Sequence, residues 1–244
     1  MTPKNIVKSL WNGFERLDFE LGDRKATVVF PKERGVSQKW ILKTEYLDAY
    51  PEMEIELLKR GYARAFISNR SRWCLAGDLE AKEEFCNFLQ SEYGFHSKCI
   101  PLGMSCGGMI AIYFAAKFPH RVAGLYLDAP VTNLLSCPCN VGNGKSNIYE
   151  EFCAATGLTR IDMINYRNHP IDCIDDLLQH QIPILLVCGD RDEDVPYEEN
   201  GMIFAQRYLE GGGDLKQILV KGRGHNPHHP QNPDLVFQFV DQYY

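Results

Sequence analysis

The run GMSCGG at residues 103–108 constrains the fold more than any other segment of the chain. The β-rich run KCIPL leads directly into it, and the helical pattern MIAIYFAAKF follows it at once. Glycine-x-serine-x-glycine between a strand and a helix is the nucleophile-elbow pattern, in which the serine hydroxyl stands clear of a sharp, strained turn. The flanking glycines lack the β-carbons that would clash there. The pattern predicts Ser105 as a nucleophile and the Cys106 amide as an oxyanion donor.

An alternative for this turn is a glycine-rich junction that only packs closely or binds a phosphate. Dinucleotide folds carry G-x-G-x-x-G, and P-loops carry a lysine near the end of their motif. Neither feature is present at residues 103–108. The strand before the turn and the helix after it therefore favour the elbow.

Short β-rich runs alternate with longer segments of helical period along most of the chain. The runs begin at Trp40, Ala63, Lys98, Val122, Ile182 and Lys216, and the helical segments cover residues 51–60, 78–93, 108–118, 198–209 and 233–243. Two earlier segments, 14–20 and 25–31, flank the turn signal Gly22-Asp23 and predict an antiparallel hairpin. The order predicts an α/β fold with a mainly parallel, doubly wound sheet covered by helices on both faces.

Size and charge limit the classes of protein to consider. A chain of 244 residues with 45% hydrophobic content can bury a sizeable core, so we expect one domain over residues 1–244. The net charge of -6, without a long block of like charge, disfavours nucleic acid and anionic membranes as partners. The first 23 residues contain no apolar run of signal-peptide length, and no run in the chain approaches the length of a membrane span, which predicts a cytoplasmic protein.

The interval between Ala129 and Gln181 breaks the strand and helix rhythm. Ligands of doubly wound sheets bind beyond the carboxyl ends of the strands, so an insertion that emerges there is expected to act as a lid. We predict a lid over residues 130–180, after the sixth strand. Its aromatic residues Tyr149 and Tyr166 are candidates for substrate binding, although either could equally belong to the core of the lid.

An elbow predicts an acid and then a histidine further along the chain, each on a loop after a later strand. The β-rich run from Ile182 ends in the acidic loop GDRDEDVP at residues 189–196. One carboxylate of this loop is expected to orient the histidine, and Asp190, Asp192 and Asp194 are the candidates. Most acidic residues of such a loop are expected to be solvated.

The last β-rich run ends in KGRGHNPHHP at residues 221–230. His225 follows it most closely and is predicted to be the general base, while His228 is expected to line the entrance to the substrate site. Three histidines also suggest a metal, but a metal site leaves the elbow unexplained, and Cys137 and Cys139 lack a second pair at ligand spacing. We therefore expect no metal and no cofactor. Nine scattered cysteines favour reduced thiols.

These motifs resemble the α/β-hydrolase superfamily over essentially the whole chain, and within it bacterial hydrolases found near carbohydrate-degrading genes. The shared landmarks are WILKTEY from Trp40, GMSCGG from Gly103, YLDAPV from Tyr126, CGDRDEDVPYEEN from Cys188 and GHNPH from Gly224. The resemblance implies the α/β-hydrolase fold. The G-x-x-D spacing before Val195 also resembles the family's acid loop, which implies Asp192 as the carboxylate that orients the histidine, with Asp190 as a turn-former and Asp194 as the alternative. In that fold the second oxyanion donor comes from the loop after the third strand, here the Thr44 or Glu45 amide. Trp40 opens the same landmark and is a candidate for substrate binding.

The combined pattern predicts a serine hydrolase that cleaves a small carboxylic ester through an acyl-enzyme, with short acyl groups on a carbohydrate or another small alcohol as the expected substrates. An aminopeptidase-like enzyme is the alternative, because G-x-S-x-G-G also marks prolyl-peptidase relatives. Those peptidases usually carry a large additional domain, for which this chain has no length. A non-catalytic binding protein on the same scaffold is the third possibility. The sequence leaves the oligomeric state open.

Overall fold

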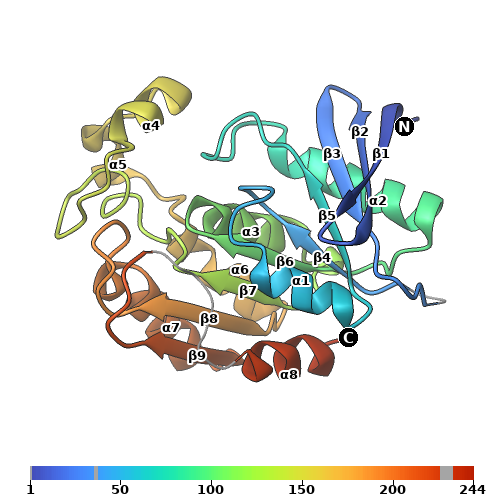
Figure 1. Ribbon diagram of the computed structural model, residues 1–244. Helices are drawn as coiled ribbons and strands as arrows, with labels where there is room; N and C mark the ends of the chain where they lie inside the picture. Colours follow the sequence, from blue (N-terminus) through green and yellow to red (C-terminus); the bar gives the residue numbers. More distant parts are fainter. Residues whose placement is uncertain (1, 36–37, 226–232) are drawn as a thin grey trace.

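The structure, a computed structural model, describes residues 2–35, 38–225 and 233–244 (Figure 1). The described residues form a nine-stranded sheet in the order β1-β2-β3-β5-β4-β6-β7-β8-β9. The strands are β1 (Lys4–Trp11), β2 (Phe14–Leu21), β3 (Arg24–Val29), β4 (Trp40–Lys43), β5 (Ala63–Ile67), β6 (Ile100–Met104), β7 (Leu125–Asp128), β8 (Ile184–Gly189) and β9 (Leu215–Val220). All pairs from β5 to β9 are parallel, so the ends of β6, β8 and β9 meet at one edge.

The amino-terminal part of the sheet is antiparallel. The predicted hairpin is confirmed as β2 and β3, which turn at Gly22 with a φ of 65°. The sequence did not predict β1, which pairs with the outer side of β2. Its eight residues are almost all exposed, so they lack the alternation of buried and exposed side chains that marks a strand. Because of this extra strand, the predicted insertion follows the seventh strand, β7, and the prediction that it follows the sixth strand is wrong.

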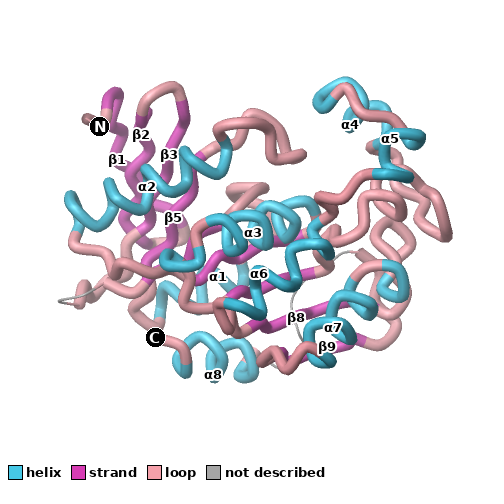
Figure 2. Tube along the Cα trace, turned by 180° about the vertical axis from the view of Figure 1, so that it is seen from behind, coloured by secondary structure: helices cyan, strands magenta, loops and turns pink. Residues whose placement is uncertain are grey.

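Helices cover both faces of the sheet, as predicted (Figures 1 and 2). The helices are α1 (Glu52–Lys59), α2 (Asp78–Tyr93), α3 (Cys106–Lys117), α4 (Tyr149–Thr156), α5 (Arg160–Asn165), α6 (Ile174–Gln179), α7 (Gly201–Glu210) and α8 (Asp234–Gln242), with short 3-10 turns η1 (Pro119–Arg121), η2 (Pro170–Cys173) and η3 (Tyr197–Glu199). One face buries the apolar sides of α2, α3, α6 and α7, and the other buries those of α1 and α8. The fold is therefore the predicted α/β-hydrolase fold.

The segment between β7 and β8 holds α4, α5, η2 and α6. Its part up to Tyr166 packs in a separate apolar cluster with the first turns of α3, the helix that follows Ser105. Phe152 is buried in that cluster and meets Trp73 edge to face, with ring centroids 5.1 Å apart. The segment thus lies on the Ser105 side of the sheet, with α4 and α5 standing out at the end of the molecule (Figure 1).

Candidate active site

Ser105 forms the sharp turn between β6 and α3. Its φ is 52° and its ψ is -121°, a backbone conformation that non-glycine residues rarely adopt. The Ser105 amide donates to the Asp128 carbonyl at 3.0 Å, which ties the turn to the end of β7. A β-carbon on Gly103 would lie 2.4 Å from the Gly107 carbonyl oxygen, so the close approach of strand and helix requires glycine there.

Two later loops bring a histidine and an aspartate to this serine. His225 Nε2 lies 3.0 Å from Ser105 Oγ, and His225 Nδ1 lies 2.8 Å from Asp192 Oδ2. The other Asp192 oxygen accepts the amides of Asp194 and Val195, at 3.0 and 2.8 Å. These contacts fix the carboxylate, and a histidine that donates to it from Nδ1 presents Nε2 as an acceptor for the serine hydroxyl.

Hydrogen bonds also join the loop after β8 to the loop after β9. The Arg191 amide donates to the Arg223 carbonyl at 2.8 Å, and Asp190 accepts the Gly222 amide at 2.5 Å. Asp190 is therefore a turn-former that joins the loop after β8 to the loop after β9. Asp194 instead lines the pocket beside Ser105.

The charge around His225 favours its protonated form. Burial lowers the pKa of the imidazole, but the hydrogen bond with Asp192 and the carboxylates of Asp192, Asp194 and Asp128 raise it more, so the pKa stands above its ordinary value. The side chain is 15% exposed, and that of Asp192 is 2% exposed. The pair therefore lies largely out of water.

A pocket of about 260 Å³ opens at Ser105 and His225. Its walls come from the loop after β4, the loop that carries Arg72, the insertion and the acidic loop. The remaining lining residues are Tyr46, Ala49, Tyr50, Arg72, Met104, Cys137, Ser146, Asn147, Ile148, Asp194 and Val195. A cavity of this size accommodates a small acyl or alcohol group.

Cys106 follows the nucleophile as the first residue of α3. Its thiol is fully buried in the apolar cluster shared with the insertion, and burial raises its pKa to about 11. The thiol is therefore neutral at pH 7 and acts in packing. Its backbone amide lies at the electropositive end of the helix dipole, which favours a negative charge nearby.

The two predicted donors from the loop after β4 differ in availability. The Thr44 amide donates to the Leu102 carbonyl at 3.2 Å, and its hydroxyl donates to the Gly107 carbonyl at 2.7 Å. Both donors of Thr44 are thus engaged in holding the elbow. The Glu45 amide nitrogen lies near the elbow, 3.4 Å from the position of a β-carbon on Gly107. Glu45 remains the candidate.

Three of the predicted substrate-binding residues lie elsewhere than in the pocket. Trp40 is fully buried in the core of the sheet, as are all the side chains of β4, and its Nε1 donates to the His96 carbonyl at 2.9 Å. Tyr149 accepts the Arg160 amide at 3.1 Å, and the Tyr166 ring stacks edge to face on His169. Both tyrosines therefore belong to the packing of the insertion. His228 falls outside the described residues.

Sequence reasoning missed Tyr46 and Arg72. Tyr46 has a φ of 56°, and burial together with the Cys106 side chain raises the pKa of its hydroxyl well above the ordinary range. Arg72 forms an ion pair with Glu151 of α4 at 2.9 Å. Tyr46 stands in the WILKTEY landmark and could have been selected there, whereas no motif marks Arg72.

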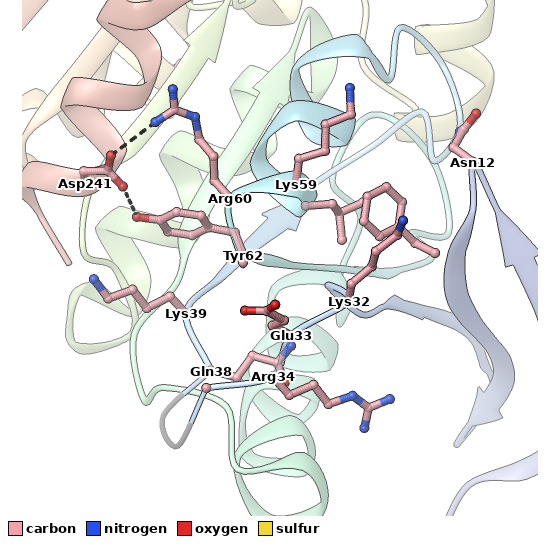
Figure 3. Close-up of a pocket in the computed structure, with 14 residues that line it drawn as sticks. Asn12, Lys32, Glu33, Arg34, Gln38, Lys39, Lys59, Arg60, Tyr62 and Asp241 are labelled. Carbon is pink, nitrogen blue, oxygen red and sulfur yellow. Dashed lines mark hydrogen bonds and ion pairs between the residues drawn. The ribbon is translucent and has the colours of Figure 1, made fainter.

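A larger hollow of about 860 Å³ lies on another part of the surface, near the ends of α1 and α8 (Figure 3). Its rim carries lysines and arginines together with Glu33 and Asp241, and Asp241 accepts the Tyr62 hydroxyl at 2.5 Å. None of Ser105, Asp192 and His225 lines it. The smaller pocket is therefore the candidate active site.

Within residues 2–35, 38–225 and 233–244, no three His, Cys, Asp or Glu side chains gather as they would around a metal ion. Over the same ranges no helix combines the length and apolar character needed to cross a membrane.

Solved structures share the fold at low sequence identity. An acylaminoacyl peptidase from Pyrococcus horikoshii superposes with a TM-score of 0.69 and 13% identity, covering 99% of this chain and 41% of its own. An acetyl xylan esterase from Paenibacillus sp. R4 superposes with a TM-score of 0.68 and 13% identity, and the match covers 100% of this chain and 90% of the esterase. A truncated carbohydrate esterase from gut microbiota superposes with a TM-score of 0.70 and 17% identity. The match covers 89% of this chain and 90% of the esterase. The chain thus spans about two fifths of the peptidase.

The fold and the serine, histidine and aspartate at its sheet edge are those of the α/β-type serine hydrolases. The model of the prolyl oligopeptidase family matches residues 83–244, more than half of the chain. The chain therefore belongs to the prolyl oligopeptidase family. Among curated proteins, none matches it significantly.

Proposed function

We propose that this protein is a serine hydrolase that cleaves carboxylic esters, with Ser105 as the nucleophile, His225 as the general base and Asp192 as the carboxylate that orients the base. The observation that carries the proposal is the continuous hydrogen-bonded chain from Asp192 through His225 to Ser105 Oγ, which opens on a pocket of about 260 Å³. This order of groups activates a serine hydroxyl at neutral pH.

Ser105 Oγ attacks the acyl carbon while His225 Nε2 takes its proton. The tetrahedral oxyanion is bound by the Cys106 amide and by the Glu45 amide. When the intermediate collapses, the alcohol leaves with the proton from His225, and the acyl group stays on Ser105. Water then attacks the acyl-enzyme, His225 accepts its proton, and the acid is released as that proton returns to Ser105.

The substrates we propose are short acyl groups on a carbohydrate or another small alcohol. The pocket is small, and the walls formed by Tyr46, Met104, Ile148 and Val195 are mainly apolar. An acetyl xylan esterase and a carbohydrate esterase share the fold at 90% coverage of their own chains, which supports this class. An ester also has a better leaving group than a peptide, so it needs less protonation of the leaving group.

An aminopeptidase-like activity is the second candidate, and the family match favours it. A protonated peptide amine is bound most strongly by carboxylates that face the site. Among the described lining residues of the Ser105 pocket, Asp194 is the only acidic one. We therefore rank the ester reaction first.

We also propose that residues 130–180 act as a lid within a single domain of residues 1–244. Four residues of the segment, Cys137, Ser146, Asn147 and Ile148, line the pocket beside Ser105. A lid would supply the enclosure that the loops of the sheet lack, since a binding pocket usually buries most of a small ligand.

The test is a side-by-side measurement of kcat/KM on p-nitrophenyl acetate, acetylated sugars and aminoacyl anilides, with Ser105→Ala as the control. We expect turnover of the esters, little of the anilides, and a loss of about 10⁴-fold or more in the variant without unfolding. The reverse preference would assign the protein to the peptidases. Full activity of Ser105→Ala would contradict the mechanism, and an inactive wild type would indicate a binding protein on this scaffold.

A further inference from the structure

The loop 44–50, between β4 and α1, forms one wall of the Ser105 pocket. Tyr46, Ala49 and Tyr50 all line the pocket. Tyr46 and Tyr50 have φ values of 56° and 48°, in the left-handed region where a bulky side chain is strained. Such conformations persist only where surrounding contacts over-determine them. The loop therefore needs strong anchors.

One anchor is Lys43, the last residue of β4, whose side chain is fully buried. Its ammonium donates to the Glu54 carboxylate, to the Ala49 carbonyl at 3.1 Å and to Met104 Sδ at 3.2 Å. An ammonium has three protons, so each is used. Ala49 belongs to the loop, and Met104 directly precedes Ser105. A single charged group thus joins the pocket wall to the strand that carries the nucleophile.

Glu54 and Arg64 complete the cluster, and both side chains are 1% exposed. Arg64 Nε donates to the second Glu54 oxygen, and its guanidinium also reaches Asp48 at 3.4 Å. On the solvent side, Arg16 donates to the other Asp48 oxygen at 2.9 Å. The loop is therefore held at two adjacent residues, Ala49 from the core and Asp48 from Arg16 and Arg64.

Stability alone does not account for three buried ionised groups, because well-packed apolar side chains of similar size are often as stable. Directed hydrogen bonds, in contrast, hold a backbone segment in one position. We infer that Lys43 is a positioning residue: through Ala49 and Met104 it fixes the loop 44–50 relative to Ser105, and with it the Glu45 amide and the tyrosine wall. The kinetic consequence rests on the proposed function, whereas the loop's rigidity does not.

The test compares Lys43→Met, which keeps length and removes the charge, with Tyr208→Phe. Tyr208 lies in α7, and its hydroxyl donates to the Ile182 carbonyl at 2.5 Å, so its loss weakens the core without touching the pocket. Hydrogen exchange of the amides at 44–50 reports on the loop, and the kinetics of p-nitrophenyl acetate report on catalysis. In Lys43→Met we expect exchange at least tenfold faster in this loop and kcat at least tenfold lower, with KM changed less than threefold.

Tyr208→Phe should change neither the exchange rate of the loop nor kcat, even if its melting temperature falls as far as that of Lys43→Met. Equal effects in both variants, or none in Lys43→Met, would overturn the inference. If Lys43→Met does not fold, Asp48→Asn removes the partly exposed anchor instead; we expect the same two effects at about threefold, and their absence would overturn the inference too. Should the wild type hydrolyse none of the substrates, the exchange data alone decide, so the failure of the proposed function is recognised separately.

Discussion

Asp192 holds His225 with one carboxylate oxygen, at 2.8 Å from Nδ1, while its other oxygen accepts two backbone amides. An asparagine at position 192 could keep the size of the side chain but would present an amide donor to the imidazole, which favours the wrong tautomer. We therefore expect Asp192→Asn to lower kcat on a short ester by roughly 10³ to 10⁴-fold with little loss of structure.

Asp194→Asn is the matched control, because Asp194 lines the same pocket and raises the pKa of His225 through its charge, whereas Asp192 accepts a hydrogen bond from the imidazole. It should change kcat less than about tenfold. Kinetics of both variants on one ester decide between the two carboxylates. A larger loss in Asp194→Asn would exchange their roles.

The raised pKa of His225 predicts a pH dependence. The base must be neutral to accept the serine proton, so kcat/KM should rise with pH through a value above 6.5, the ordinary pKa of the imidazole. In Asp192→Asn the same limb should move to lower pH, because the hydrogen bond and the negative charge that favour the imidazolium are lost. Profiles of kcat/KM from acidic to mildly alkaline pH measure both. A limb that stays in place in the variant would contradict the electrostatic cause.

Gly108 is required by its contact with the start of the insertion. A β-carbon there would lie 2.5 Å from Pro130 Cβ and 2.8 Å from Pro130 Cα, which cannot move away as a side-chain tip could. We expect Gly108→Ala to lower the free energy of unfolding by about 1–3 kcal/mol in urea titrations, despite the better helix propensity of alanine. Gly211→Ala, which meets only the movable end of Leu178, should cost less than half as much.

The proposed lid predicts an effect of its core on substrate binding. Phe152→Ala removes the ring that packs on Trp73, and large-to-small changes of this kind cost about 3–5 kcal/mol where the site cannot collapse. We expect the insertion to loosen first, so that KM rises and proteolysis within 130–180 becomes faster, while Ser105 stays reactive. Ile161→Ala on α5, at a side chain 78% exposed, should leave both unchanged. An unaltered KM in Phe152→Ala would argue against a lid.

The sequence predicted most of the fold because its main elements have strong patterns. The helical period over residues 78–93 coincides with α2, and the segment over 108–118 differs from α3 by only two residues at its start and one at its end. The alternation of strands and helices and the elbow follow from local patterns, the position of His225 follows from its place after the last strand, and the choice of Asp192 depends on the resemblance of its loop to that of the family.

The pocket walls could not be predicted in this way. All four side chains of β4 are buried, so no alternation indicates that Trp40 faces the core. Tyr149 and Tyr166 share their aromatic character with true pocket residues, and only packing separates the two groups. Arg72 reaches the pocket because its loop crosses to α4, a tertiary contact without a local signal.

At position 105 the residue that the proposed reaction needs differs from the residue that the backbone conformation favours. Its φ of 52° with ψ of -121° is tolerated best by glycine, which has no hydroxyl to offer. Selection for a high melting temperature alone would thus favour the substitution Ser105→Gly, which would relieve the backbone strain and remove the proposed nucleophile. The proposed function therefore predicts that a relative with glycine at this position has given up the reaction and kept the scaffold.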